Sequence, residues 1–279
     1  MKFTKMHGAG NDYIYFNCLE ESIENPEALS IRLSDRHLSV GGDGIVLICP
    51  SAVADVKMRM FNADGSEGKM CGNAIRCVAK YVYDRGIAAK ELIEVETLSG
   101  VKQIMVSVEE GKVKQAKVDM GQATGLSPDE ITIPEGQSNF LKNFPLLASD
   151  ITWEITTVSM GNPHCVVFLP EVAGLDLLKI GPDFEKHPFF PQQINTEFVR
   201  IISPQILEMR VWERGSGETL ACGTGACAAV MAAILNGYCT ENTDVTVRLL
   251  GGELTIRVTD ETVYMTGNAV EVFAGEIEV

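Results

Sequence analysis

Alternating apolar and polar positions run through most of this chain and predict a protein built mainly of β-strands. Three such segments follow one another with short glycine-containing turns between them: residues 92–97, 102–110 and 112–120. A period of two is typical of antiparallel strands with one buried face. Two other segments, 72–85 and 223–236, have helical character, and each is followed by a glycine, Gly86 or Gly237, of the kind that ends helices. We therefore expect many strands and one long helix in each half of the chain.

The two predicted helices differ in polarity. Segment 223–236 contains no charged residue and consists largely of alanine and larger apolar residues, so we expect protein on every side of it. Segment 72–85 carries Arg76, Lys80 and Asp84 at four-residue spacing. This spacing predicts a charged stripe that faces away from the sheet.

Three further segments have weaker patterns. Residues 25–38 are typical of a short helix, with Asn25 as its N-cap and Pro26 at the first helical position. A loop-rich helical region is expected at residues 172–191. Residues 121–150 are rich in turn-forming and polar residues, which indicates a linker between two halves.

An internal repeat organises the chain. Met58–Asn73 aligns with Met209–Thr224 without a gap, at an offset of 151 residues (209 minus 58). The same offset places Asn11 on Asn162, each just before an apolar, strand-like run. A shared offset in separate motifs indicates a duplicated domain. We predict an α+β fold of two pseudo-symmetric domains, each a mainly antiparallel sheet curled around a central helix.

The end of the chain exceeds what the second copy needs. Residues 263–269 already match residues 117–123 of the first copy, which leaves the strand-like segment 270–279 over. We expect this strand to return to the first domain. The predicted domains are therefore residues 1–118 together with 268–279, and residues 119–267.

Composition excludes several classes of partner. The net charge is −15, with 23 Lys and Arg against 38 Asp and Glu, so we expect no nucleic-acid partner. No apolar run approaches the roughly 20 residues of a membrane-spanning helix, and the first residues lack the apolar stretch of a signal peptide. We expect a cytoplasmic protein with no membrane partner.

The eight cysteines include no CxxC pair, so we expect reduced thiols and no metal site. Four of them lie in or beside apolar runs and are expected to be inert, buried thiols: Cys18, Cys49, Cys165 and Cys239. Cys71 and Cys222 differ, because the repeat places each just before a predicted helix. The positive end of the helix dipole is expected to lower the pKa of such a cysteine.

Two equivalent cysteines suit one particular reaction. Removing a proton from one face of a carbon and returning one to the other face requires two acid–base groups, which a duplicated domain supplies. The backbone N–H groups at the two helix starts can hold a carboxylate; they belong to Gly72, Asn73, Gly223 and Thr224. No lysine is placed to carry pyridoxal phosphate and no nucleotide-binding glycine loop is present. The pattern favours a racemase or epimerase without a cofactor, acting on a small molecule.

Several motifs together resemble one family. These are NADGSEGKMCGNAIR at 62–76, MHGAGNDYI at 6–14, SMGNPHCV at 159–166, ERGSGETLACGTGACA at 213–228 and VFAGEIEV at 272–279. They are similar, in this order, to the motifs of the diaminopimelate epimerase family. The resemblance implies two similar domains with the active site in the cleft between them, a homodimer, and a last strand that rejoins the first domain. It also implies the interconversion of LL- and meso-diaminopimelate for lysine and peptidoglycan synthesis, without cofactor.

The resemblance assigns roles to matching positions. Cys71 and Cys222 match the two bases of the family. Gly72, Asn73, Gly223 and Thr224 match the residues that bind the reacting carboxylate. The residues that match those holding the substrate, chiefly its distal amino-acid end, are Asn11, Asn62, Asn162, Asn195 and Arg214. His164 and Glu213 match polar groups near the reacting centre. One position departs from the family, because Gly44 stands where some members carry a substrate-contacting glutamine.

Other interpretations remain open at this point. Asn62 can be part of an ordinary turn, Glu213 and Arg214 can be a solvated pair, and His164 can be a satisfied core histidine. Within the enzymes, a racemase of the proline-racemase type is the second hypothesis. A thiol redox protein with Cys71 and Cys222 as a switchable disulfide is the third. Exchange of an α-proton in deuterium oxide distinguishes the first two from the third.

Overall fold

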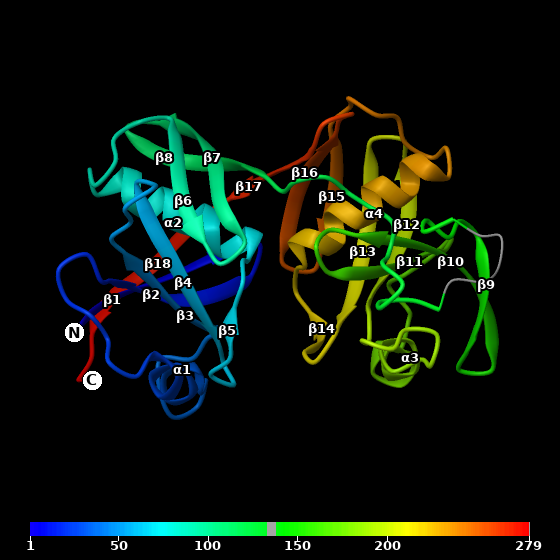
Figure 1. Ribbon diagram of the computed structural model, residues 1–279, viewed down its shortest axis with the longest axis horizontal. Helices are drawn as coiled ribbons and strands as arrows, with labels where there is room; N and C mark the ends of the chain where they lie inside the picture. Colours follow the sequence, from blue (N-terminus) through cyan, green and yellow to red (C-terminus); the bar gives the residue numbers. More distant parts are fainter. Residues whose placement is uncertain (133–137, 279) are drawn as a thin grey trace. The chain divides into compact units, whose positions relative to one another are not determined.

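The computed structural model describes residues 1–132 and 138–278 and has a mixed α+β fold. Its described part contains four helices and eighteen strands (Figure 1). Contacts divide the chain into two compact units. Unit 1 consists of Met1–Asp119 and Thr266–Val279, and unit 2 consists of Met120–Met265.

Unit 1 is built on one mixed sheet. Its strands are β1 (Lys2–Gly8), β2 (Asn11–Asn17), β3 (Gly44–Cys49), β4 (Val56–Asn62), β5 (Glu67–Gly68), β6 (Leu92–Thr97), β7 (Gly100–Glu109), β8 (Lys112–Asp119) and β18 (Val270–Glu276). The sheet order is β18, β1, β2, β3, β4, β6, β7, β8, and β5 folds back on β4. The β2–β3 and β4–β6 pairs are parallel, and the others are antiparallel. The antiparallel strands that the alternating pattern predicts at β6, β7 and β8 are confirmed.

The last strand of the chain lies against the first one. β18 pairs with β1 in antiparallel register, with Lys2 opposite Glu276 and His7 opposite Val270. The amide of Ile277 also donates to the carbonyl oxygen of Met1, at 2.9 Å. Figure 1 shows the two strands together as red and dark blue ribbons.

Two helices accompany this sheet. α1 (Pro26–Ser34) packs on β3 and β4, and its N-cap is Asn25, whose side chain accepts from the amide of Ala28. The predicted N-cap is confirmed, although the helix ends earlier than expected. α2 (Gly72–Asp84) contacts β1 and β2 as well as β6, β7 and β8. It ends before Gly86, which has a φ of +69°, in the left-handed region where glycine is favoured.

The prediction that a charged stripe of α2 faces away from the sheet is wrong. Arg76 is fully buried, and its guanidinium donates to the carbonyl oxygen of Gly72 at 3.1 Å and to Oδ1 of Asn73 at 3.0 Å. Lys80 and Asp84 form an ion pair of 2.8 Å with little exposure, and Lys80 also donates to the carbonyl oxygen of Val113. The four-residue spacing agrees with the pairing of Lys80 and Asp84. Strands cover this face of the helix, however, so its charged side chains find their partners inside the protein.

Unit 2 repeats this plan with a second set of strands. Its strands are β9 (Phe144–Ala148), β10 (Ile151–Ser159), β11 (Pro163–Phe168), β12 (Asn195–Ser203), β13 (Ile206–Glu213), β14 (Gly217–Thr219), β15 (Val245–Leu249) and β16 (Gly252–Val258). The order is β9, β10, β11, β12, β13, β15, β16, with β14 folded back on β13. The β11–β12 and β13–β15 pairs are parallel. The remaining strand, β17 (Val263–Asn268), runs across the boundary of the two units along the chain.

The helices of unit 2 follow those of unit 1 at a constant offset. α3 spans Leu177–Glu185 and α4 spans Gly223–Leu235. Both offsets equal 151 residues (177 minus 26, and 223 minus 72), the value that relates the sequence motifs. α4 contacts six strands of its unit and most of its residues are buried, which confirms the prediction from its lack of charge.

The prediction of a linker at 121–150 is wrong for most of that segment. It contains β9, which pairs with β10, and several of its apolar side chains join the core of unit 2. Those core residues are Leu126, Ile131, Leu141, Leu146 and Ala148. Residues 133–137 of the segment lie outside the described residues. The turn-forming residues were recognised correctly, but the apolar residues between them pack into the core of unit 2.

Candidate active site

In unit 1 the candidate site begins at the N-terminus of α2. Cys71 is the N-cap residue, with extended backbone angles, and its carbonyl oxygen accepts the first intrahelical hydrogen bond from Ile75 at 2.9 Å. The N–H groups of Gly72 and Asn73 precede this bond, so the helix itself provides no acceptor for them. Sγ of Cys71 lies 3.3 Å from Oδ1 of Asn11 and donates to it. A thiol and two helix-start amides therefore lie together.

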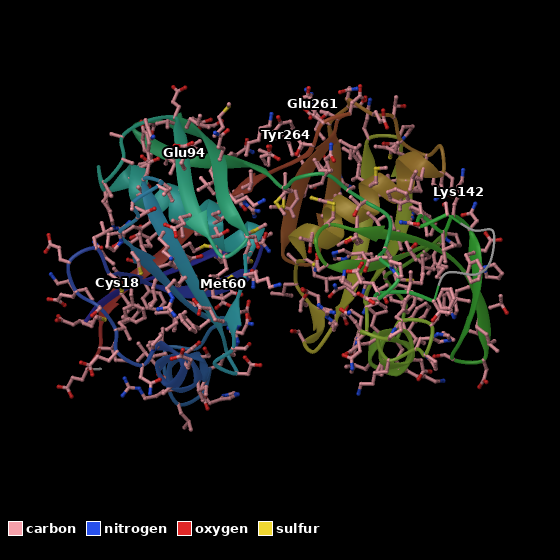
Figure 2. The ribbon with its side chains drawn as sticks, viewed as in Figure 1. Cys18, Met60, Glu94, Lys142, Glu261 and Tyr264 are labelled. Carbon is pink, nitrogen blue, oxygen red and sulfur yellow. The ribbon has the colours of Figure 1, made fainter. Side chains whose placement is uncertain are left out.

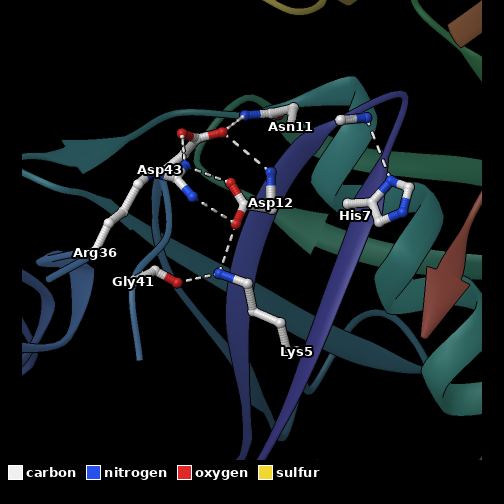
Figure 3. Close-up of polar contacts among 8 residues, drawn as sticks. Lys5, His7, Asn11, Asp12, Arg36, Gly41 and Asp43 are labelled. Carbon is white, nitrogen blue, oxygen red and sulfur yellow. Dashed lines mark hydrogen bonds and ion pairs between the residues drawn. The ribbon is translucent and has the colours of Figure 1, made fainter. Parts of the chain in front are cut away.

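A polar network fixes the orientation of Asn11 (Figure 3). Nδ2 of Asn11 donates to Oδ2 of Asp43 at 2.7 Å, and the same oxygen accepts from the amide of Asp12 at 3.0 Å. Arg36 binds both carboxylates, and Lys5 forms an ion pair of 2.6 Å with Asp12. Because Nδ2 is committed to Asp43, Oδ1 of Asn11 must face Cys71. Burial by itself would raise the pKa of Asp12, but the hydrogen bonds from Arg36 and Lys5 outweigh it and lower that pKa.

Asn73 is buried between this network and the helix. Its Nδ2 reaches Oδ1 of Asn11 at 3.4 Å, and its Oδ1 accepts from Arg76 at 3.0 Å. Gly8 passes close by, and a β-carbon there would lie 2.8 Å from Nη2 of Arg76. A glycine in β1 is therefore needed for the buried arginine to reach Asn73.

Asn62 and Gly44 lie at the adjoining ends of β4 and β3. Asn62 is held in a turn by Ser66. Its side-chain Nδ2 donates to Oγ of Ser66 at 3.0 Å, and its backbone amide donates to the carbonyl oxygen of Ser66. Gly44 has a φ of +154°, and a β-carbon at this position would overlap the carbonyl oxygen of Phe61. This backbone arrangement has no room for a glutamine side chain at position 44.

In unit 2 the N-terminus of α4 presents Cys222 in the matching position. Sγ of Cys222 accepts from the amide of Gly225 at 3.3 Å and lies 3.5 Å from Oγ1 of Thr224. Only 5% of the residue is exposed. Burial, followed by the nearby Glu213 and Glu197 carboxylates, raises the pKa of this thiol well above its ordinary value. The predicted lowering by the helix dipole is therefore wrong for Cys222, because desolvation and two negative neighbours outweigh the helix N-terminus.

A chain of polar side chains leads away from Cys222 into the core. Thr224 accepts from Nδ2 of Asn162 at 3.3 Å, and Oδ1 of Asn162 lies 3.1 Å from Nε2 of His164. Nδ1 of His164 lies 2.7 Å from Oε1 of Glu197. The chain passes from the thiol to a buried carboxyl group through neighbouring polar atoms only.

Sequence reasoning missed Glu197. It lies on β12 in the apolar segment INTEFVRII, and an acidic residue at a buried strand position is the signal that could have identified it. The packing there is close, since a β-carbon on Gly225 would lie 2.5 Å from Oε1 of Glu197 and 3.2 Å from Sγ of Cys222. Asp43 and Arg36 were missed too, because charged loop residues are common and nothing local relates them to Asn11.

Glu213 and Arg214 behave differently although they are neighbours. The Glu213 side chain accepts from Thr219 and hydrogen-bonds with Cys222, and burial raises the pKa of its carboxyl group. Arg214 is exposed, and its guanidinium donates to the carbonyl oxygen of Gln192 at 2.9 Å. A simple solvated pair does not describe them, since one faces the thiol and the other faces outward.

Asn195 supports Arg214 through the backbone. Its Oδ1 accepts from the amide of Arg214 at 3.0 Å, and its Nδ2 donates to the carbonyl oxygen of Pro163 at 2.9 Å. The amide side chain keeps one further N–H and one further lone pair. Asn195 thus holds the end of β13 beside the start of β11.

Each unit assembles its own set of predicted residues. Unit 1 brings together Asn11, Cys71, Gly72 and Asn73, whereas Asn62 bonds to its own turn. Unit 2 brings together Asn162, His164, Glu213, Cys222, Gly223 and Thr224, with Asn195 beside Arg214. Across residues 1–132 and 138–278, no three His, Cys, Asp or Glu side chains converge to hold a metal ion. None of the helices in this described part is long and apolar enough to cross a membrane.

Comparisons with known proteins agree on one family. The family model "Diaminopimelate epimerase" matches residues 3–126 and 156–272. A diaminopimelate epimerase from Acetivibrio thermocellus is 53% identical, over 100% of this chain and 99% of that relative. One from Desulfovibrio desulfuricans is 54% identical, over 99% of this chain and 98% of that relative.

Solved structures of more distant proteins share the fold. A PhzF-family phenazine biosynthesis protein from Bacillus anthracis superposes with a TM-score of 0.73 at 18% identity, over 100% of this chain and 99% of that one. A hydroxyproline epimerase from Agrobacterium vitis gives a TM-score of 0.72 at 12% identity, over 99% and 91%. At such identities the likeness concerns the mixed α+β fold alone. On the full-length identity to its relatives and the match of the family model, this chain belongs to the diaminopimelate epimerase family.

Proposed function

We propose that this protein is a cofactor-independent epimerase that interconverts LL- and meso-diaminopimelate, with Cys71 and Cys222 as its acid–base groups. The observation that carries the proposal is that each cysteine is the N-cap of a helix, α2 or α4, at the same offset of 151 residues. Membership of the family and 53% identity to the Acetivibrio thermocellus epimerase support the choice of substrate.

The reaction requires both cysteines to act on one carbon. A base must approach the α-carbon from one face and an acid from the other, so we propose one substrate site to which both units contribute. In this proposal residues 1–118 with 268–279, and residues 119–267, are two pseudo-symmetric epimerase domains. Each has a mainly antiparallel sheet curled around its helix, and the substrate binds in the cleft between them. The family resemblance and the need for two opposed groups support this arrangement.

Protons and charges balance without a cofactor. A thiolate takes the α-proton as the C–H bond breaks, and the thiol on the other face delivers its proton as the new C–H bond forms. In between, negative charge moves onto the α-carboxylate, where helix-start N–H groups stabilise it. The groups placed for this are the amides of Gly72, Asn73, Gly223 and Thr224. After one turnover the thiol and the thiolate have exchanged positions.

The two thiols differ in their surroundings. Sγ of Cys71 donates to Asn11, whereas Sγ of Cys222 accepts from the amide of Gly225 and has a raised pKa because of burial. Burial therefore favours the protonated thiol of Cys222 when no substrate is bound. The α-ammonium group of a bound substrate would favour the thiolate form of Cys71, since a nearby positive charge stabilises a thiolate.

The distal end of the substrate is a second amino acid that does not react. Its carboxylate matches the planar guanidinium of Arg214, which the carbonyl oxygen of Gln192 holds at 2.9 Å. Its ammonium group needs acceptors, and the amide oxygens of Asn62, Asn162 and Asn195 are the proposed ones. His164 and Glu213 then act near the reacting centre, through Asn162 and Cys222. A homodimer remains an expectation from the family, which analytical ultracentrifugation would test.

The test is α-proton exchange with LL-diaminopimelate in deuterium oxide. Wild-type protein should incorporate deuterium and form the meso isomer, and Cys71→Ala and Cys222→Ala should each lose inversion by roughly 10²–10⁴-fold, as expected when a general acid or base is removed. Cys239→Ala is the matched control, since Cys239 lies outside both helix starts. Near wild-type inversion by the Cys222→Ala protein would exclude the two-cysteine mechanism.

A further inference from the structure

Cys18 and Cys49 lie side by side at the ends of two neighbouring strands of unit 1. The parallel β2–β3 ladder pairs Asn17 with Ile48, so Cys18 and Cys49 are the next residues on the two strands. The amide of Cys18 donates to the carbonyl oxygen of Ile48 at 2.8 Å, which continues the ladder to this point. Neighbouring strands lie about 4.8 Å apart. The Cα separation that a disulfide needs is roughly 4.4–6.8 Å, so the two cysteines are within reach of each other.

Their side chains also point the same way. Alternate residues face one apolar core: Ile14 and Phe16 of β2 with Cys18 directly after it, and Ile45, Leu47 and Cys49 of β3. Each thiol also acts on the pKa of the other, raising that of Cys18 and lowering that of Cys49. Figure 2 labels Cys18 among the side chains of this unit.

The two thiols are not equivalent. Cys18 is 6% exposed, whereas Cys49 is partly exposed at the edge of the core. The hydrogen bond from Cys18 lowers the pKa of Cys49 to about 7, against its own desolvation, with help from Arg59 and Lys57.

Among the described residues, the charges that act on the pair belong to Glu21, Lys57, Arg59 and Glu67. The hydrogen bond to Cys49 and burial raise the pKa of Cys18, with Glu21 adding to the rise. Glu67, paired with Arg59 at 2.7 Å, opposes the effect of that arginine on Cys49 only in part. One accessible thiol of thiolate character thus lies against one buried, protonated thiol, in contrast to the expectation that both are inert.

We propose that Cys49 and Cys18 form an oxidation site for peroxides, in which Cys49 reacts first and Cys18 then closes a disulfide. In the first step the Cys49 thiolate attacks a peroxide oxygen. An S–O bond forms, the O–O bond breaks, and the leaving hydroxide takes up a proton to become water. In the second step the Cys18 sulfur attacks the sulfenic acid as its proton leaves. An S–S bond forms, the S–O bond breaks, and a second water is released. Two thiols are oxidised and one peroxide is reduced.

This site is separate from the candidate active site. β2 begins at Asn11 and β3 begins at Gly44, both near the start of α2, whereas Cys18 and Cys49 lie at the other ends of the strands. Seven residues of β-strand at about 3.3 Å each span roughly 20 Å. Oxidation of the pair therefore does not involve Cys71, and this proposal is separate from the epimerase mechanism.

The test is peptide mapping of the whole protein after hydrogen peroxide. Folded wild-type protein is treated near pH 7.5 at a range of peroxide doses, remaining thiols are alkylated, and the digest is examined by mass spectrometry. We expect a Cys18–Cys49 disulfide to form at lower doses than any oxidation of Cys239, whose pKa is raised to about 11 by burial. In Cys18→Ser protein, dimedone should trap a sulfenic acid at Cys49. Cys239→Ser is the control and should still form the Cys18–Cys49 linkage.

Several results would overturn the proposal. One is a Cys49 that stays reduced at doses that oxidise Cys239, and another is a Cys49 linked to a cysteine other than Cys18. The wild-type mapping decides this even if a variant fails to fold. Diaminopimelate epimerisation by Cys18→Ser and Cys49→Ser proteins should stay within about twofold of wild type. Loss of the Cys18–Cys49 disulfide with epimerase activity retained, or loss of activity with the disulfide retained, distinguishes this proposal from the proposed function.

Discussion

His164 and Glu197 form a fully buried pair in unit 2, with 2.7 Å between Nδ1 and Oε1 and no exposure of either side chain. Both ring nitrogens face oxygen atoms, because Oδ1 of Asn162 lies 3.1 Å from Nε2. The ring is thus held on both sides, by Glu197 and by Asn162. Among the described residues Oε2 of Glu197 has no hydrogen-bond partner. The carboxyl group therefore depends on His164.

Replacing Glu197 should destabilise the protein strongly. Glu197→Ala leaves His164 buried without its carboxyl partner, which costs roughly 3–5 kcal/mol of the free energy of unfolding. Urea unfolding of the two proteins measures the difference. The control is Glu253→Ala, since the Arg248–Glu253 pair is exposed and such pairs contribute about 0–1 kcal/mol. Equal, small losses in both variants would show that the buried pair is not an ion pair.

Glu213 should control the acidity of Cys222. Burial is the larger cause of the raised pKa of Cys222, and the Glu213 carboxylate adds to it. Glu213→Gln removes that charge and should lower the pKa of Cys222. Iodoacetamide should then modify Cys222 at a lower pH than in the wild type, as peptide mass spectrometry across a pH series would show. Glu218→Gln is the control, because Glu218 is paired with Arg210 instead. An unchanged or upward-shifted profile for Glu213→Gln would contradict this account.

Catalysis should depend on the guanidinium group of Arg214. Arg214→Lys keeps the charge but loses the planar fork and its bond to the carbonyl oxygen of Gln192, so kcat/KM for LL-diaminopimelate should fall about 10²-fold, as small misplacements can cost. The protein should remain folded by circular dichroism. L-lysine, which lacks the second carboxylate, should be worse by roughly 10⁴-fold. Arg257→Lys, at an exposed pair with Asp244, is the control; an Arg214→Lys enzyme of normal efficiency would leave the distal end unexplained.

Asp12 should make unit 1 sensitive to acid. Its pKa is lowered in the folded protein, despite burial, by hydrogen bonds from Arg36 and Lys5. The folded state thus binds fewer protons there than the unfolded state, so this stability is present above the unfolded pKa of about 3.9. It is lost as pH falls through the lower, folded pKa. In Asp12→Asn the free energy of unfolding should fall less steeply below about pH 4. Denaturant melts at several pH values test this, with the exposed Asp244→Asn as control.

Much of the fold could be predicted because it repeats. The offset of 151 residues located both long helices and the cysteines at their starts, since glycine stops and apolar periodicity are local signals. The positions that failed depend on distant neighbours. Nothing near Arg76 in the sequence indicates that β1 and Asn268 enclose its guanidinium.

The sequence predicted where the two cysteines of the candidate site lie, but not the residues that support the site. Glu197 contacts His164 across a parallel strand pair, and Asp43 reaches Asn11 from 32 residues away along the chain. Such partners depend on strand register, which a single sequence does not specify. The prediction of a lowered pKa for Cys222 was wrong for the same reason. The helix start can be recognised in the sequence, but the two carboxylates around the thiol cannot.

The pairing of β18 with β1 also sets an order of events during translation. Unit 2 is a single stretch, Met120–Met265, whereas unit 1 needs residues from both sides of it. The ribosome therefore finishes every residue of unit 2 before it makes the strand that closes the sheet of unit 1. Until then β1 has an unpaired edge, of the kind that other chains can bind. The half of the protein that is made first is the half that matures last, and a nascent chain stalled before residue 266 carries the edge strand that chaperones would have to cover.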